Sequence, residues 1–271
     1  MMRSMFAAIS GLRVHQAMLD VAANDIANVN TLGFKAQRTS FKDALSQLAR
    51  GSSAPAATVG GTNPVQIGLG VQLGSIDNMM QTGAIQSTGN AFDLAVQGDG
   101  WFNVTDDTST FANILYTRAG NFTRDKNGDL VTPEGYYLVG YAGNPSVQTK
   151  ITIPSTVDSV TIGQDGNVTT VTAGVPTVVA QIRLAKFAND AGLQRMSGNK
   201  FGASSNSGAP TVAAPGTGGN GLLAPGAVEM SNVDLAQEFT SMIIAQRGFQ
   251  ANSRVITAAD EMLQELVNLK R

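Results

Sequence analysis

The stretch that decides the fold lies near the C-terminus and reads Leu235-Ala-Gln-Glu-Phe239-Thr-Ser-Met242-Ile-Ile-Ala-Gln246-Arg247-Gly-Phe249. It opens a helical heptad pattern in which apolar side chains recur at every seventh residue: Leu235, Met242, Phe249, Ile256 and Leu263. Phe239 lies at one of the interleaved positions. The resulting apolar stripe is narrow, which is typical of a coiled-coil seam rather than of a globular helix face. Ser231 and Asp234 before it predict an N-cap and a first-turn acidic residue.

The N-terminus carries a second seam of the same kind. Met5, Leu12, Leu19 and Ile26 recur at every seventh residue, with Ile9 between them. We expect a helix from residue 1 to about residue 30, where asparagines and a glycine follow that usually end helices. The two ends of the chain therefore have the same design.

The middle of the chain, from about residue 66 to residue 201, does not show the heptad spacing of apolar residues found at the two ends. Short apolar runs alternate with turn signals such as Asn127-Gly128 and Asp165-Gly166. The sequence thus predicts an α+β protein: an antiparallel, β-rich central domain, with N- and C-terminal heptad helices that form a coiled-coil-like inner domain. We expect these parts: residues 1–34 with 229–271 as a helical polymerisation domain, 35–75 as an extended or loop connection, 76–201 as an outer β-rich domain, and 202–228 as a flexible connection.

Composition limits the function. Charged residues make up 14% of the 271 residues, the net charge is −2, and there is no cysteine. A net charge of −2 does not indicate a nucleic-acid partner, and no apolar run is long enough for a membrane span. His15 is the only histidine, so neither a catalytic triad nor a histidine metal site is indicated. We expect no enzyme activity, no cofactor and no metal.

Two interpretations of the helical seams stay open at this point. In the first, the helices close the core of their own domain, as in a secreted β-rich binding module. In the second, they find partners in a polymer, because large apolar residues left in water mark an interaction surface. A third class, a hydrolase that uses surface aspartates, would need a cleft that the sequence does not indicate.

Several segments resemble one known family. They are Leu19–Lys35, Val228–Leu235 and Met242–Gln250, together with Asp93–Gly100 and Tyr116–Phe122 in the middle of the chain. These segments resemble the bacterial flagellar rod and hook proteins over nearly the whole chain. The residues that match the family's terminal motifs are Asn24, Asn28, Gly33, Phe34, Ser231, Asn232, Val233, Gln246 and Arg247.

The resemblance implies that the terminal helices assemble subunits into a tube. The residues expected to do so are Met5, Ile9, Leu12, Leu19, Ile26, Leu235, Phe239, Met242, Phe249, Ile256 and Leu263. Residues 60–70 and 265–271 are most similar to short-form hook proteins, which form a bendable tube that couples the rod to the filament and transmits torque. The alternative is the distal rod protein, a drive shaft of the basal body that shares the insertion around residues 45–65.

The same resemblance implies the partners and the location. Copies of this chain would form a homopolymer, flanked by rod proteins and by hook–filament junction proteins. A hook cap and the type III export apparatus would act during assembly. We expect the protein in the flagellar hook or basal body, outside the cell, after export without a cleaved signal peptide.

Overall fold

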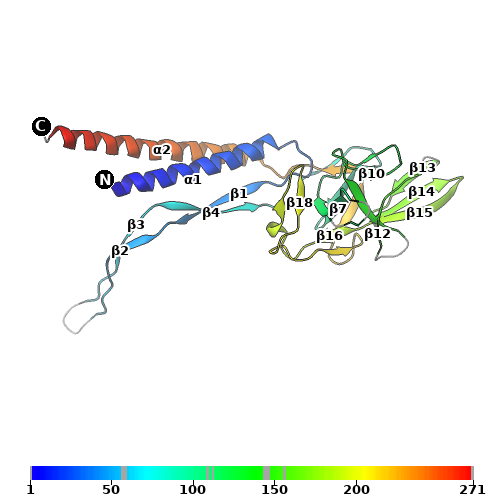
Figure 1. Ribbon diagram of the computed structural model, residues 1–271, viewed down its shortest axis with the longest axis horizontal. Helices are drawn as coiled ribbons and strands as arrows, with labels where there is room; N and C mark the ends of the chain where they lie inside the picture. The colour runs from blue at the N-terminus through cyan, green and yellow to red at the C-terminus, as the bar shows by residue number, and fades with distance from the viewer. Residues whose placement is uncertain are drawn as a thin grey trace. The chain divides into compact units, whose positions relative to one another are not determined.

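The computed structural model describes residues 2–55, 60–107, 110–111, 113–142, 147–154 and 157–269. The chain divides into two compact units (Figure 1). The helical unit comprises Met1–Ala27, Gln37–Asn78 and Asp234–Arg271, and the β-rich unit comprises Asn28–Ala36 and Met79–Val233. The expected α+β class, with terminal helices and an antiparallel β-rich middle, is confirmed.

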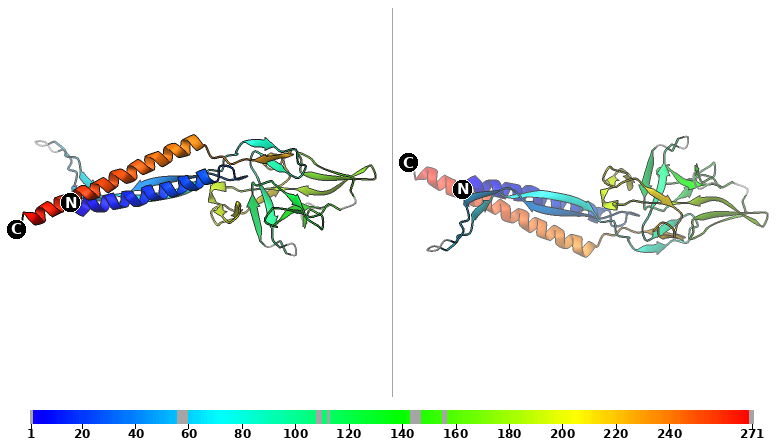
Figure 2. Two further views of the ribbon diagram at one scale, coloured as in Figure 1. Left: turned by 90° about the horizontal axis from the view of Figure 1, so that it is seen from above. Right: turned by 90° about the horizontal axis from the view of Figure 1, so that it is seen from below.

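Two long helices form the frame of the helical unit. Helix α1 spans Met2–Ala27 and helix α2 spans Leu235–Asn268. They lie side by side in all three views and run antiparallel, since Gly11 faces Asn252 and His15 faces Gly248 (Figures 1 and 2). The N-cap of α2 is Asp234 rather than the expected Ser231. The Asp234 carboxylate accepts hydrogen bonds from the amides of the first turn, which a serine three residues earlier cannot reach.

The segment Gln37–Asn78 of the helical unit folds as a two-stranded ribbon. Strand β1 (Gln37–Asp43) pairs with β4 (Val71–Asn78), and β2 (Ser46–Arg50) pairs with β3 (Val65–Gly68). Both pairs are antiparallel. β1 and β4 lie along α1, whereas all residues of β2 and β3 are exposed (Figure 2). The extended connection expected over residues 35–75 is therefore largely a hydrogen-bonded hairpin.

The β-rich unit is built around one large antiparallel sheet with two smaller strand pairs. The central strand order is β13-β14-β15-β11-β7-β8-β18-β17, and β5–β21 and β6–β20 form the separate pairs. Its strands are β5 (Ile85–Ser87), β6 (Leu94–Gln97), β7 (Trp101–Thr105), β8 (Ile114–Thr117), β9 (Thr123–Arg124), β10 (Leu130–Val131), β11 (Tyr137–Tyr141), β12 (Gln148–Lys150), β13 (Ser159–Ile162), β14 (Asn167–Thr172), β15 (Val175–Ile182), β16 (Leu184–Lys186), β17 (Gln194–Arg195), β18 (Lys200–Gly202), β19 (Thr211–Ala213), β20 (Leu222–Pro225) and β21 (Ala227–Glu229), with a short 3₁₀ turn η1 (Asp190–Gly192).

Two apolar clusters form the core of this unit. The larger cluster gathers aliphatic side chains around Phe102 and Phe122, whose rings meet edge to face at 5.3 Å. The smaller cluster centres on Trp101, Tyr116 and Phe201. Trp101, Phe102 and Phe201 come from strands β7 and β18, in which every residue is buried, which explains why the sequence shows apolar runs there rather than strict alternation.

The structure differs from the expected flexible connection over residues 202–228. Strands β19, β20 and β21 lie in this range and pair with β16, β6 and β5. Small residues are needed here because the backbones approach closely: a Cβ on Gly221 would lie 2.0 Å from the Gln97 carbonyl oxygen. A composition that resembles a linker therefore reflects tight packing.

Neither of the described helices contains an apolar stretch long enough to cross a membrane.

Candidate functional site

Small residues form the contact between the two long helices. Gly248 lies under the His15 ring, where a Cβ would come within 2.5 Å of ring atoms, and Gly11 lies equally close under Asn252. The fully buried residues of the pair are also mostly small, namely Ala8, Gly11, Val14 and Ala22 of α1 and Ala245 and Ala259 of α2. The side chains of His15 and Asn252 thus pack over glycines of the partner helix. The intramolecular seam therefore leaves the larger apolar residues at its edges.

The residues expected to take part in assembly are among these larger apolar residues at the edges of the seam. On α1, Met5, Ile9, Leu12, Leu19 and Ile26 are half-buried, as are Met242, Ile256 and Leu263 on α2. Leu235, Phe239 and Phe249 are exposed, and Phe239 shows 51% of its surface. Ile243, Ile244, Val255, Met262 and Leu266 of the same helix are exposed as well, although they stand outside the heptad pattern. Helix α2 therefore presents large apolar side chains to solvent along its whole length, as an interaction surface does.

The hairpin adds a second exposed apolar surface. Leu45, Leu48, Val65, Ile67 and Leu69 all show more than a third of their surface. They lie around strands β2 and β3, which have no packed face of their own. Isolated two-stranded ribbons of this kind are marginally stable in water. The helical unit thus has two different apolar surfaces without a partner.

Carboxylates gather near the start of α2. Asp25 of α1 is fully buried and accepts a hydrogen bond from the Gln37 amide at 2.8 Å. Burial raises the pKa of the Glu238 carboxyl, and the negative charges of Asp25 and Asp234 raise it further. The first turn of α2 therefore carries repulsion that is relieved when Glu238 takes up a proton.

A buried ion cluster lies in the β-rich unit, and we call it the junction cluster: Lys35, Gly83, Arg118, Glu229 and Asn232. The Glu229 carboxylate accepts hydrogen bonds from Lys35 Nζ at 2.6 Å, from the Gly83 amide at 2.9 Å and from Arg118 Nη1 at 3.2 Å. All three charged side chains are at most 3% exposed. Burial lowers the pKa of Lys35, and the nearby Glu229 carboxylate opposes that shift.

Asn232 completes the junction cluster through its amide group. Its Oδ1 accepts from the Ala36 amide at 2.7 Å, and its Nδ2 donates to the carbonyls of Met79 and Gln81. Lys35 Nζ also donates to the Gln81 carbonyl, at 2.8 Å. One asparagine and one glutamate thus hold three separate segments of the chain together.

Two more residues of the predicted motif set support Lys35. Gly33 has φ = +65°, and its amide donates to the Glu229 carbonyl. A Cβ there would lie 2.5 Å from the Ala119 amide nitrogen, so only glycine fits. Phe34 is buried under the Arg195 guanidinium, 4.6 Å from the ring centre, and Arg195 donates to the Lys35 carbonyl.

The remaining motif residues lie outside the junction cluster. The Ser231 hydroxyl accepts from the Val233 amide just before α2 begins. Asn24, Gln246 and Arg247 are exposed on the two helices. Asn28 lies in the β-rich unit, where it accepts a hydrogen bond from the Thr31 hydroxyl.

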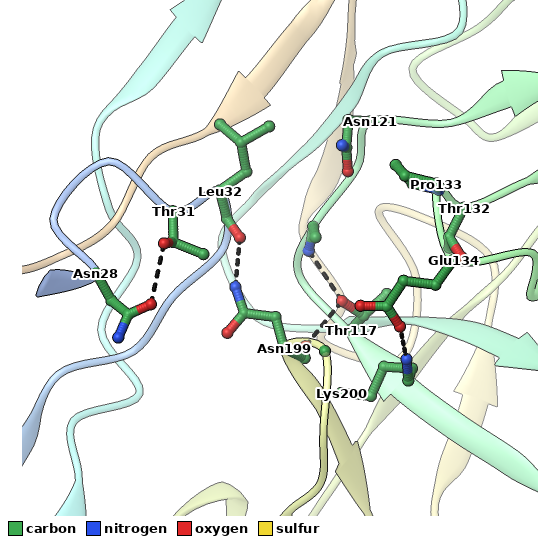
Figure 3. Close-up of a pocket in the computed structure, with 12 residues that line it drawn as sticks. Asn28, Thr31, Leu32, Thr117, Asn121, Thr132, Pro133, Glu134, Asn199 and Lys200 are labelled. Atoms are coloured by element: carbon green, nitrogen blue, oxygen red, sulfur yellow. Dashed lines mark hydrogen bonds and ion pairs between the residues drawn. The ribbon is translucent and has the colours of Figure 1, made fainter. Parts of the chain in front are cut away.

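The segment that contains Asn28 borders a cavity of about 420 Å³ (Figure 3). Its other walls come from the segment Thr117–Asn121 and from the loops around Thr132 and Asn199. The polar groups mostly pair with each other: Asn199 Nδ2 donates to the Leu32 carbonyl, and Lys200 pairs with Glu134. Because these groups bind one another, the arrangement fastens residues 28–32 to the sheet. No cluster of three metal-ligating side chains occurs among the described residues.

Sequence reasoning missed Lys35, Arg118 and Glu229 as site residues. All three lie inside the segments that resemble the family, but they are separated by up to 194 positions in the chain. The sequence feature that could have indicated them is a charged residue within a motif of mostly apolar or small residues. The sequence pattern does not show which of these charged residues contact one another.

Three family models match this chain. Residues 5–35 match a model described as "Flagella basal body rod protein", residues 95–170 the "Flagellar hook protein FlgE/F/G D1 domain", and residues 224–269 the "Flagellar basal body rod FlgEFG protein C-terminal". The flagellar basal-body rod protein FlgG of Bacillus subtilis is 50% identical over 273 residues, covering all of both chains. The chain belongs to the flagellar rod and hook protein family.

Two further members of the family match with lower identity. FlgG of Caulobacter vibrioides is 39% identical over 99% of this chain and the whole of its own length. The flagellar hook protein FlgE of Borreliella burgdorferi is 28% identical, over an alignment of 445 positions that spans both proteins. The family resemblance drawn from the terminal motifs is therefore confirmed, and the family is one of structural flagellar proteins.

Proposed function

We propose that this chain is a structural subunit of the rod of the bacterial flagellar basal body. The observation that carries the proposal is the end-to-end match to FlgG rod proteins of the same length. The hook protein aligns only when the alignment is stretched to 445 positions, far beyond the 271 residues present here. The rod, named above as the alternative, therefore has more support than the hook.

The geometry of the helical unit supports self-assembly. Helix α2 and the β2–β3 ribbon expose two different apolar surfaces, at Phe239 and Ile243 and at Leu48 and Ile67. When two unlike surfaces on one subunit meet across copies, the contact is heterologous and continues into a helical polymer unless the rotation closes a ring. The expected seam residues of α1 and α2 border these surfaces and take part in the same contacts.

The neighbours of the polymer follow from the same proposal. A rod subunit contacts further copies of itself, other rod proteins and the hook. The hook–filament junction proteins and the hook cap belong to the hook alternative. Delivery by type III export to the basal body completes the proposal.

Electron microscopy of the purified, concentrated protein tests this function. Straight tubes support the rod, curved tubes support the hook, and a protein that stays monomeric at high concentration supports the binding module. Phe249→Asp should abolish the tubes while the β-rich unit stays folded, because a buried charge is costly in an apolar contact. Gln250→Asp adds the same charge at the next exposed position and serves as the matched control.

A further inference from the structure

The chain passes between the helical and the β-rich unit at four places, after residues 27, 36, 78 and 233. Within the β-rich unit, three segments serve these crossings: residues 28–36, the segment that begins at residue 79, and the segment that ends at residue 233. Hydrogen bonds join all three. The Met79 amide donates to the Ala36 carbonyl, and the Gly33 amide donates to the Glu229 carbonyl, both at 2.8 Å.

The junction cluster lies where these three segments meet. Lys35 belongs to the first, Gly83 to the second and Glu229 to the third, and the Glu229 carboxylate binds both of the others directly. Arg118, which directly follows strand β8, ties the same carboxylate to the sheet, and its Nη2 also donates to the Gly98 carbonyl at 2.8 Å. Every segment that carries the chain out of the sheet is thus fixed to one buried charge.

The charges in this cluster oppose the opening of any one of the three segments. Two cations share one carboxylate, so the loss of Glu229 leaves two buried positive charges without their partner. Breaking a buried ion pair on one side costs far more than the intact pair gains. Partial opening of one segment is therefore disfavoured, and the three segments stay in register together.

We propose that the junction cluster is a mechanical lock in which Glu229 holds the three exit segments rigid, so that load on the helical unit reaches the sheet without local unfolding. Because the proposal concerns load, it rests on the proposed function as a tube-forming rod subunit. It assigns Glu229 a positioning role that acts through Lys35, Gly83 and Arg118.

The ion pair of Asp129 and Lys150 provides a comparison within the same unit. Asp129 is fully buried, accepts from Lys150 Nζ at 2.6 Å and also binds the Thr152 hydroxyl, whereas the Lys150 side chain is 42% exposed. None of these residues lies in the exit segments, which comprise residues 28–36, 79–84 and 229–233. A variant at Asp129 therefore removes a buried carboxylate from an ion pair of the same unit without touching the lock.

Hydrogen exchange on the full-length monomer tests the lock directly. In Glu229→Gln, amides of residues 33–36, 79–84 and 229–232 should lose protection about 100-fold or more, as expected for a broken buried ion pair. Amides of β14 and β15 should keep their protection. Asp129→Asn should lower protection around residues 129 and 150–152 and leave the exit segments unchanged. Equal loss at the exit segments in both variants, or no loss in Glu229→Gln, would overturn the lock.

A second variant covers the case in which Glu229→Gln does not fold. Lys35→Met leaves the Arg118–Glu229 pair neutral, so it should lower protection of the exit segments less, by about tenfold. Unchanged protection there would also refute the lock. Tubes of Lys35→Met should lose straightness in electron micrographs, whereas tubes of Asp129→Asn should not. If the wild-type chain forms no tubes, the rod function fails while the exchange result still decides the lock.

Discussion

Phe239 offers the sharpest test of the exposed surface on α2. Its ring is 51% exposed in the single chain, which corresponds to about 100 Å² of a side chain of 150–250 Å². Burying that area in a polymer contributes about 2.5 kcal/mol at 25 cal/mol per Å². Alanine keeps a fraction of this contribution, so Phe239→Ala should weaken each subunit contact by about 1.5–2 kcal/mol.

The assay is the critical concentration for tube formation, measured by sedimentation. The expected rise is about 10- to 30-fold, since 1.4 kcal/mol corresponds to a factor of ten. Stability of the monomer should fall by no more than about 1–2 kcal/mol, because the buried half of the ring is lost while alanine gains about 0.5 kcal/mol of helix propensity over phenylalanine. Gln250→Ala, at an exposed polar position of the same helix, should leave both quantities unchanged. A critical concentration within threefold of wild type, roughly 0.6 kcal/mol, would show that α2 does not assemble through this surface.

Three further predictions concern the monomer. Gly120→Ala should destabilise the β-rich unit by about 3 kcal/mol or more in denaturant unfolding, because its Cβ would lie 1.6 Å from the Leu94 carbonyl oxygen. Gly248→Ala should lower the melting temperature, since the clash with His15 outweighs about 1 kcal/mol of helix propensity; in a His15→Ala background the same change should raise it. The Glu238 carboxyl has a raised pKa, so its contribution to stability is complete below pH 4.5 and is lost as the pH rises through the folded-state pKa. Glu238→Gln should remove this loss, and thermal unfolding between pH 4 and pH 8 measures it; an unchanged profile would contradict the assignment.

The helices and the β-rich middle could be predicted because each follows a local pattern. The heptads of α1 and α2 repeat for several turns, and turn pairs such as Asn127-Gly128 separate the strands. The seam itself was harder to predict. Large residues such as Leu19 dominate a heptad pattern, but Gly11 and Gly248 allow the close approach, and small residues carry little weight in such a pattern.

The remaining differences arise from long-range contacts. The range 202–228 resembles a linker in composition, yet the partner of β20 is β6, more than a hundred residues away. The junction cluster unites Lys35, Arg118 and Glu229 in the same manner. Neither pairing leaves a periodic trace in the sequence, because contacts of this kind depend on topology rather than on neighbouring residues.

The antiparallel pairing of α1 with α2 also determines when the helical unit can fold. Residues 15 and 248 must meet, so the unit has a very high contact order, and closing so long a loop is slow compared with forming hairpins inside the sheet. The β-rich unit can form while the far end of the chain is still unfolded. The helical unit is completed last, so a truncated chain that lacks α2 forms no paired helices. The pairing of the two ends therefore couples the folding of the helical unit to the presence of both ends of the chain.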